Sequence, residues 1–374
     1  KRNIVNENGL YVEAVQAYDD MEFLASKDER FRPVSLYNGP DGSMYVVDMY
    51  KGIIQHEVYL TDYLREQIKN RGLEKPLGLG RIYKITYKGA WKDRLLNTFQ
   101  RNEQPNLDKA SDRELVEYLS HPNGWWRDNA QRLLIERNNK ATIPSLIEIL
   151  KSRNNSITKL HALWTLEGMN VFTPEVIMLG LSTKDEKVAA AALRIGERNS
   201  DNKDAEATLA IYKETLKIDS EILRLQLALS LGEFMESYPE TVMDMLAAIA
   251  KEHEDEPLIG EALKSSIVGS EQVFLNLLKT RSPESQIMIA SLSESLEKIS
   301  LRNSLSSKSL STEEKQQYIV GKPLYETACA SCHGLDGQGL VPIAPPLVES
   351  EWVEGSEERL VMVVLHGLEE PITG

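Results

Sequence analysis

Ala130-Gln131-Arg132-Leu133-Leu134-Ile135-Glu136 is the first of four similar runs in which apolar residues lead up to a glutamate. The other three runs end at Glu167, Glu197 and Glu233, so the four glutamates are 31, 30 and 36 residues apart. In each run the apolar residues are spaced as on one face of a helix. The repeat therefore predicts one helical unit used several times, and a chain that is mainly α.

Further apolar segments between these runs, over residues 143–150 and 242–250, predict a second helix in each unit. A helix pair every 30 to 36 residues is typical of an α-solenoid, although HEAT repeats are usually longer. We predict HEAT-like repeats over residues 91–300, with an irregular helical domain as the alternative. Trp125 and Trp126 are expected to anchor an interface between repeats.

The first ninety residues are predicted to be rich in β-strands. Strands are expected over residues 31–37, 43–50 and 80–87, with another possible at 52–56, a turn at 38–42, and a helix over 59–71 ended by Gly72. This is one blade's worth of strands, whereas a propeller needs about four to eight blades. Residues 1–90 are therefore interpreted as the last, incomplete blade of a β-propeller.

Composition excludes several classes of protein. The chain has 374 residues with 43 Lys and Arg against 57 Asp and Glu, a formal net charge of −14. So acidic a chain is unsuited to binding nucleic acid through its phosphates. No apolar run approaches the roughly 18 residues of a transmembrane helix, so no transmembrane segment is expected. The unusual start at Lys1 and end at Gly374 lead us to expect a piece of a longer chain, cut at both ends.

The only two cysteines lie in Cys329-Ala330-Ser331-Cys332-His333, which has the C-x-x-C-H pattern of c-type haem attachment. Two thiols three residues apart share a helix face and can form thioethers with the two vinyl groups of one haem. His333 then follows as the proximal iron ligand. A thioredoxin-like pair would need a parallel sheet, and a zinc site would need two more ligands. We therefore predict haem c, bound through Cys329, Cys332 and His333.

The surroundings of this motif resemble class I cytochrome c. Gly321 and Tyr325 precede it as the glycine and the aromatic residue of the first cytochrome helix do, and a glycine-rich loop containing Gly339 follows. The resemblance implies that Tyr325, Gly339 and Pro345 lie around the haem, with the Pro345 carbonyl accepting a hydrogen bond from His333. It covers residues 312–374, which we expect to be an all-α but incomplete haem domain. Ser311 and Glu314 form a capping box at its start, after a Ser-rich linker at 301–311.

The sixth ligand of the iron is not evident. Cytochromes of this class usually supply a distal methionine from a later loop, but after His333 the sequence offers only Met362 within an apolar, helix-like stretch. His366 is a second weak candidate. We expect the distal ligand to lie beyond Gly374.

The rest of the chain resembles the sorbosone/glucose-dehydrogenase-like family whose propeller is called the membrane-bound dehydrogenase domain. The resemblance rests on the segments 22–28, 31–50, 53–56, 80–85 and 121–134. It implies a propeller followed by HEAT-like helices and a C-terminal haem domain, with pyrroloquinoline quinone (PQQ) or a cation in the propeller. Arg32, Asp48 and His56 are then weak candidates for binding substrate, cofactor or cation. Their alternative role is structural, with Asp48 at a strand end beside Arg32.

Two functions follow from these expectations. In the first, a periplasmic or otherwise exported haem c protein passes electrons from a sugar or alcohol dehydrogenase propeller to a periplasmic or membrane redox partner, whose basic surface suits the acidic chain. In the second, the helical repeats bind a partner protein and the haem is sensory or structural. Catalysis by the electron-transfer domain itself is not implied.

Overall fold

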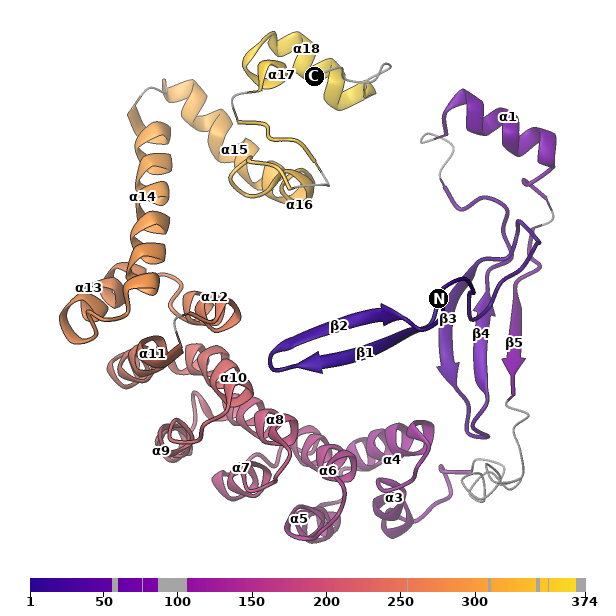
Figure 1. Cartoon of the computed structure of the whole chain (residues 1–374), viewed down its shortest axis with the longest axis vertical. Coiled ribbons are helices and arrows are strands. Elements are labelled where there is room, and N and C mark those ends of the chain that lie inside the picture. Colours follow the sequence, from indigo (N-terminus) through magenta and orange to yellow (C-terminus); the bar gives the residue numbers. More distant parts are fainter. Residues whose placement is uncertain are drawn as a thin grey trace. The chain divides into compact units, whose positions relative to one another are not determined.

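The structure is a computed structural model that describes residues 1–55, 60–75, 77–86, 106–253, 255–308, 311–340, 344–348 and 350–367 (Figure 1). Side chains are not described for residues 298–310, Thr312 and His366. The chain is mainly helical and divides into two compact units, residues 1–293 and 294–374. Each unit is considered by itself below.

The strands of the first unit form two small antiparallel sheets. β1 (Asn3–Asn8) pairs with β2 (Tyr11–Gln16), and β3 (Pro33–Asn38), β4 (Met44–Asp48) and β5 (Arg81–Ile85) form the second sheet in that order. The three strands of the second sheet lie where the alternating sequence predicts them. Their assignment to a propeller blade stays a prediction.

The segment between β4 and β5 contains helix α1 (Asp62–Arg71). Gly72 ends this helix with φ 59°, and its N–H donates to the carbonyls of Ile68 and Lys69, which confirms the predicted C-cap. The strand considered at 52–56 does not form over its described residues, 52–55. His56 lies outside the described residues.

The helices of the first unit follow one another with short connections. They are α3 (Asp112–Tyr118), α4 (Gly124–Arg137), α5 (Ile143–Lys151), α6 (Ser156–Gly168), α7 (Pro174–Leu181), α8 (Glu186–Gly196), α9 (Ala205–Thr215), α10 (Glu221–Leu231), α11 (Pro239–His253), α12 (Pro257–Ser266) and α13 (Glu271–Arg281). Helices α4, α6, α8 and α10 end at or within two residues of the four predicted glutamates. The additional helices predicted at 143–150 and 242–250 are α5 and α11.

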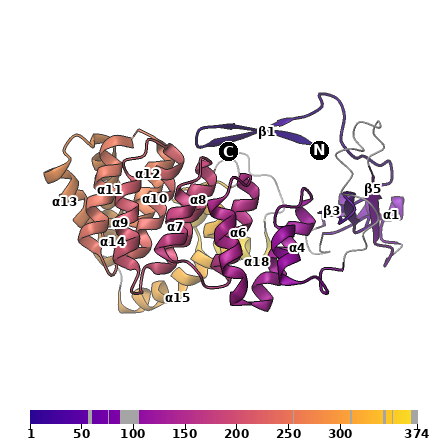
Figure 2. The same ribbon diagram turned by 90° about the horizontal axis from the view of Figure 1, so that it is seen from below.

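These helices pack in two rows. One row contains α4, α6, α8, α10 and α12, each in contact with the next, and the other contains α5, α7 and α9, which pack on one another and on the first row (Figure 1). Figure 2, turned by 90°, shows α4, α6 and α8 side by side. Between the rows lies a core of fully buried leucines such as Leu134, Leu146 and Leu166. The packing explains the repeat in the sequence, because each pair buries its apolar face against its neighbours.

The turn between β3 and β4 contacts the beginning of α4. The Asn123 side-chain amide donates to the carbonyls of Gly39 (2.8 Å) and Pro40 (3.2 Å), while its oxygen caps α4 by accepting from Trp125 N–H. The indole Nε1–H of Trp126 also donates to the Pro40 carbonyl, at 2.9 Å. Trp126 is 5 % exposed and belongs to the helical core, so this one side chain joins the core to the sheet.

The second unit is helical as well. α14 (Gln286–Lys308) runs into it from the first unit, and α15 (Thr312–Ala328), α16 (Ala330–His333), α17 (Glu351–Glu354) and α18 (Glu357–His366) follow.

The predicted linker requires a correction, because residues 301–308 continue helix α14. This segment contains no glycine or proline, and its leucine, arginine and lysine residues favour the helix, so serine alone does not end it. Residues 309–310 lie outside the described part of the chain.

Candidate haem-attachment site

The two cysteines are positioned by the end of α15. Ser311 starts this helix with the predicted capping box: the Ser311 N–H donates to the Glu314 carboxylate, and Glu314 N–H donates to the Ser311 hydroxyl. The hydrogen bonds that the Glu314 carboxylate accepts from the backbone N–H and, second, from the side chain of Ser311 lower the pKa of this carboxyl. At the other end, Cys329 is the C-cap, and its N–H donates to the Tyr325 carbonyl at 2.9 Å. The first thiol therefore lies at a fixed point, where the long helix stops.

The second cysteine and the histidine share one short helical turn. The carbonyl of Cys329 accepts hydrogen bonds from the N–H groups of Cys332 (3.1 Å) and His333 (3.0 Å). Both cysteines are free thiols; Cys329 is half-buried and Cys332 is exposed. The turn therefore presents two unbonded thiols and an imidazole within five residues, as covalent attachment of one haem requires.

The imidazole of His333 is oriented by a backbone carbonyl. Its Nδ1 atom lies 2.9 Å from the carbonyl oxygen of Pro345. Because a carbonyl oxygen only accepts, Nδ1 carries the proton of this hydrogen bond. Nε2 is then the nitrogen with a free lone pair, and a metal ion can bind there. The structure thus brings together His333 and Pro345, the pair that the cytochrome resemblance implies.

A glycine-rich loop holds this carbonyl in place. Gly339 N–H donates to the His333 carbonyl at 2.8 Å, and Leu347 N–H donates to the Gly337 carbonyl at 2.7 Å. Gly339 has φ +77°, and a Cβ atom there would lie 2.6 Å from the Ala344 carbonyl oxygen. Tyr325 joins from α15, where its hydroxyl donates to the Gly334 carbonyl at 2.7 Å. Tyr325 and Gly339 therefore act on the backbone around His333.

The apolar side chains of the second unit fit a large apolar cofactor. Where the structure describes burial in this unit, Ala330 is the only buried hydrophobic residue, and large apolar side chains are exposed on both sides of the motif. The most exposed are Ile319, Leu324, Leu335, Val364 and Leu365, each at least 62 % exposed. Apolar surface of this extent normally has a partner. A haem between these elements would cover part of it, so the residues present suit the group that the motif predicts.

The two weak candidates for a distal ligand both belong to α18. Met362 is 52 % exposed on this helix, and the side chain of His366 is not described. Nothing in the described contacts connects Met362 with His333.

The candidate residues of the propeller lie in the first unit. Asp48 is 1 % exposed, and its Oδ1 accepts from the backbone N–H groups of Arg32 (2.8 Å) and Tyr50 (2.9 Å). Asp48 Oδ2 is buried without a hydrogen-bond partner among the described residues. The Arg32 guanidinium instead donates to the carbonyls of Phe31 and Gly52. The structure thus brings Arg32 and Asp48 together through backbone hydrogen bonds, at the end of β4.

The residues that the structure describes contain no group of three or more His, Cys, Asp or Glu side chains placed to hold a metal ion. None of their helices combines the length and the apolar character needed to cross a membrane.

Comparisons with known proteins agree with the C-terminal site. Residues 316–370 match the family described as cytochrome C oxidase, cbb3-type, subunit III, and residues 1–89 match a domain of unknown function, DUF7133. No curated protein matches the chain. The likeness to the sorbosone/glucose-dehydrogenase-like family remains a resemblance. The C-terminal part of the chain is a cytochrome c domain, which implies haem c as its cofactor, electron transfer as its function and a redox partner.

Proposed function

We propose that Cys329 and Cys332 attach haem c through two thioethers and that His333 binds its iron through Nε2. The observation that carries the proposal is the 2.9 Å contact between His333 Nδ1 and the Pro345 carbonyl, which orients the ring and leaves Nε2 for the metal. When bound, haem c accepts and releases single electrons. The protein's part is to fix the axial ligand, to cover the macrocycle and to set its potential.

The residues around the motif have separate roles in this proposal. Pro345 fixes the plane of the imidazole, and hydrogen bonding to Nδ1 makes Nε2 a more basic ligand. The loop through Gly337 and Gly339 holds the Pro345 segment against the motif. Tyr325 ties α15 to Gly334, so that the helix bearing the first cysteine cannot move away from the histidine.

We further propose that the chain belongs to an exported dehydrogenase. The resemblance of the N-terminal segments to dehydrogenase propellers supports a donor domain within the same polypeptide, with PQQ or a cation there. The two rows of helices support an α-solenoid that spaces and docks the electron-transfer domain. Covalent haem attachment takes place on exported chains, which supports a periplasmic location and a periplasmic or membrane redox partner.

The attachment chemistry is tested with cysteine variants of the full chain, expressed in cells that attach haem c. The mass of wild-type protein should include one haem, and Cys329→Ala/Cys332→Ala should lose it. Either single variant should keep one thioether, shifting the α band of the pyridine haemochrome to longer wavelength because one vinyl group stays unsaturated. Ser331→Ala, between the two thiols, is the matched control and should behave as wild type. A double variant that still carries covalent haem would contradict the proposal.

The direction of electron flow needs a different measurement. Stopped-flow mixing of the longer, propeller-containing protein with sugars or alcohols should reduce the haem if the propeller is the donor. A haem that no such donor reduces would favour the alternative, a helical-repeat interaction module with a sensory or structural haem.

A further inference from the structure

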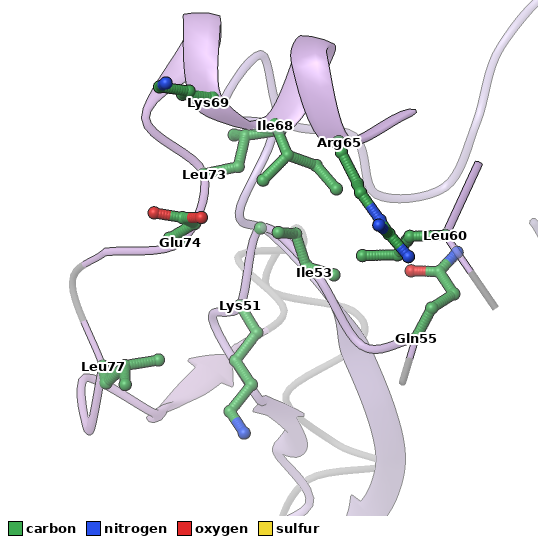
Figure 3. Close-up of a pocket in the computed structure, with 11 residues that line it drawn as sticks. Lys51, Ile53, Gln55, Leu60, Arg65, Ile68, Lys69, Leu73, Glu74 and Leu77 are labelled. Atoms are coloured by element: carbon green, nitrogen blue, oxygen red, sulfur yellow. The ribbon is translucent and has the colours of Figure 1, made fainter. Parts of the chain in front are cut away.

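A hollow of about 670 Å³ lies in the first unit, on the side of α1 that faces the segment after β4 (Figure 3). Ile53, Ile68 and Leu73 lie at its centre, with Leu60 and Leu77 farther out. Its size is within the range of small-molecule sites, and an apolar floor with a few polar groups is their usual composition. The proposed haem function does not use this hollow.

The wall formed by residues 51–55 is fixed at its base. Asp48 Oδ1 accepts from the N–H of Tyr50, which has φ +48°. The Tyr50 ring lies 3.6 Å from the guanidinium carbon of Arg81, and its hydroxyl donates to Asp28. The turn that leads into Lys51 is therefore held from three sides before any ligand binds.

The opposite wall, which follows α1, is fixed as well. The guanidinium of Arg30 donates to the carbonyls of Gly72 (2.9 Å) and Lys75 (3.0 and 3.1 Å). Gly52 touches this wall directly, since a Cβ atom there would lie 2.5 Å from the Leu73 carbonyl oxygen. A cavity with both walls held in this way is formed in advance, which lowers the entropy cost of binding.

The polar groups at the edge of the hollow are mostly cationic. Lys51, Arg65 and Lys69 line it, and Glu74 is the single acidic residue among the described lining residues. No ion pair of Lys51 or Lys69 is found within the described part of the chain. This positive edge is notable because the whole chain has a net charge of −14. An anion is therefore attracted here, although most of the protein repels it.

A smaller hollow of about 300 Å³ shares Ile53, Leu60, Ile68 and Leu73 with the larger one, and its lining includes two arginines, Arg32 and Arg71. Arg71 is paired with Glu29 at 2.8 Å, and Arg32 donates to the Gly52 carbonyl of the shared wall. Arg32, which the sequence suggested as a ligand-binding residue, is therefore next to this cavity.

We propose that this cavity binds a small amphipathic carboxylate: an acid with an aliphatic or flat apolar body. The apolar body would lie on Ile53, Ile68 and Leu73, and the carboxylate would pair with either Lys51 or Lys69, which lie at opposite ends of the hollow (Figure 3). Neither the apolar floor nor the cations at the edge would be sufficient for binding alone. An apolar molecule leaves the cations unused, and a small anion gains only exposed, salt-screened contacts.

Octanoate is the probe that tests this proposal. Octanol has the apolar chain without the carboxylate, and acetate has the carboxylate without the long chain. Isothermal titration calorimetry of the full chain should show one saturable octanoate site, with octanol and acetate bound at least about tenfold more weakly, because each lacks one set of contacts. Lys51→Gln/Lys69→Gln should weaken octanoate binding at least about tenfold while leaving octanol unchanged.

The matched control is Lys184→Gln/Lys203→Gln, which removes the same charge from two exposed positions of the helical array. It should bind octanoate as wild type does. The proposal is overturned if no saturable binding occurs at millimolar octanoate, if octanol binds as tightly as octanoate, or if both double variants behave alike. Because none of these measurements involves haem, they fail or succeed independently of the proposed electron transfer.

Discussion

His333 Nδ1 and the Pro345 carbonyl oxygen are 2.9 Å apart, although twelve residues separate them along the chain. The bond passes negative character to the imidazole, which favours oxidised over reduced iron. We expect Pro345→Gly to loosen this carbonyl and so to raise the midpoint potential of the haem-loaded protein. Each tenfold change in the relative affinity for the two iron states corresponds to about 59 mV.

Redox titration followed by absorbance measures this shift. Pro346→Gly, one residue further on, introduces the same backbone freedom without altering the residue whose carbonyl His333 contacts, and should shift the potential less. Equal shifts in the two variants would show that loop flexibility alone, rather than the hydrogen bond, sets the potential.

Gly339 should be intolerant of any side chain. It has φ +77°, and a Cβ atom would lie 2.6 Å from both the Ala344 carbonyl oxygen and the Pro345 carbonyl carbon. We expect Gly339→Ala to lower the free energy of unfolding of the cytochrome domain by about 1–3 kcal/mol and to reduce haem incorporation.

Gly367 provides the comparison, since it also has φ +77° but no atom of the described residues lies within 4 Å of a Cβ atom placed there. Gly367→Ala introduces the backbone strain without the clash, so it should lower the melting temperature less than Gly339→Ala does. If both variants melt at the same temperature, the close contact with residues 344–345 is not the reason that position 339 excludes a side chain.

The hydrogen bonds between the β3–β4 turn and the beginning of α4 can be removed selectively. Trp126→Phe keeps an aromatic ring in the core but removes the indole N–H that donates to the Pro40 carbonyl. Because this carbonyl still accepts from Asn123, the loss should be about 0.5–1.5 kcal/mol. Asn123→Asp keeps the oxygen that caps α4 and removes the amide that donates to Gly39 and Pro40. We expect both to increase amide hydrogen exchange in β3, β4 and β5.

Trp125→Phe is the control, because the indole nitrogen of Trp125 makes no hydrogen bond within the described structure. Exchange in α6 and α8 should change little in all three variants. Equal loss of protection in the sheet and the helices would instead indicate that Trp126 supports only the helical core.

His161 should make the helical array less stable in mild acid. Its Nδ1 contacts the side-chain Oε1 of Gln131, and its Nε2 accepts from the Arg127 Nε–H, so the neutral ring satisfies both contacts. Burial, and then the charge of Arg127, lower the pKa of His161, whereas Asp128 opposes the shift. Below about pH 6.5 the unfolded chain takes up a proton that the folded chain resists.

Stability associated with this group is therefore fully present above about pH 6.5 and declines as the pH falls toward the lowered pKa. His161→Gln, which can accept from Arg127 without titrating, should flatten the dependence of the melting temperature on pH between about 6.5 and 5. Curves of variant and wild type that stay parallel over this interval would contradict the assignment.

Local patterns in the sequence predicted much of this structure. The ends of α4, α6, α8 and α10 follow from apolar spacing within single helices, and the caps at Gly72 and Ser311 follow from a few adjacent residues. Such features depend on short-range sterics and hydrogen bonds, which a sequence displays directly. The same holds for Cys329, Cys332 and His333, whose spacing within one turn carries the chemistry.

Long-range contacts were harder to predict. Trp126 was expected only between helices, but its indole N–H reaches Pro40, 86 residues earlier. The hollow beside α1 is lined by Lys51 and Lys69, which belong to different segments, and no periodicity in the sequence predicts such a site. Residues 301–308 show the opposite error, because a polar composition indicated a linker where the preceding helix simply continues.

The scarcity of buried apolar side chains in the cytochrome domain has a consequence for how the protein is made. If Ala330 is the main apolar residue that the described polypeptide buries there, the polypeptide alone gains little free energy from compaction. Thioether formation would then be the step that completes folding, because it brings in the largest apolar surface. Chains that have not yet received haem should be cut by proteases between α15 and α18, so haem supply would set the amount of intact protein.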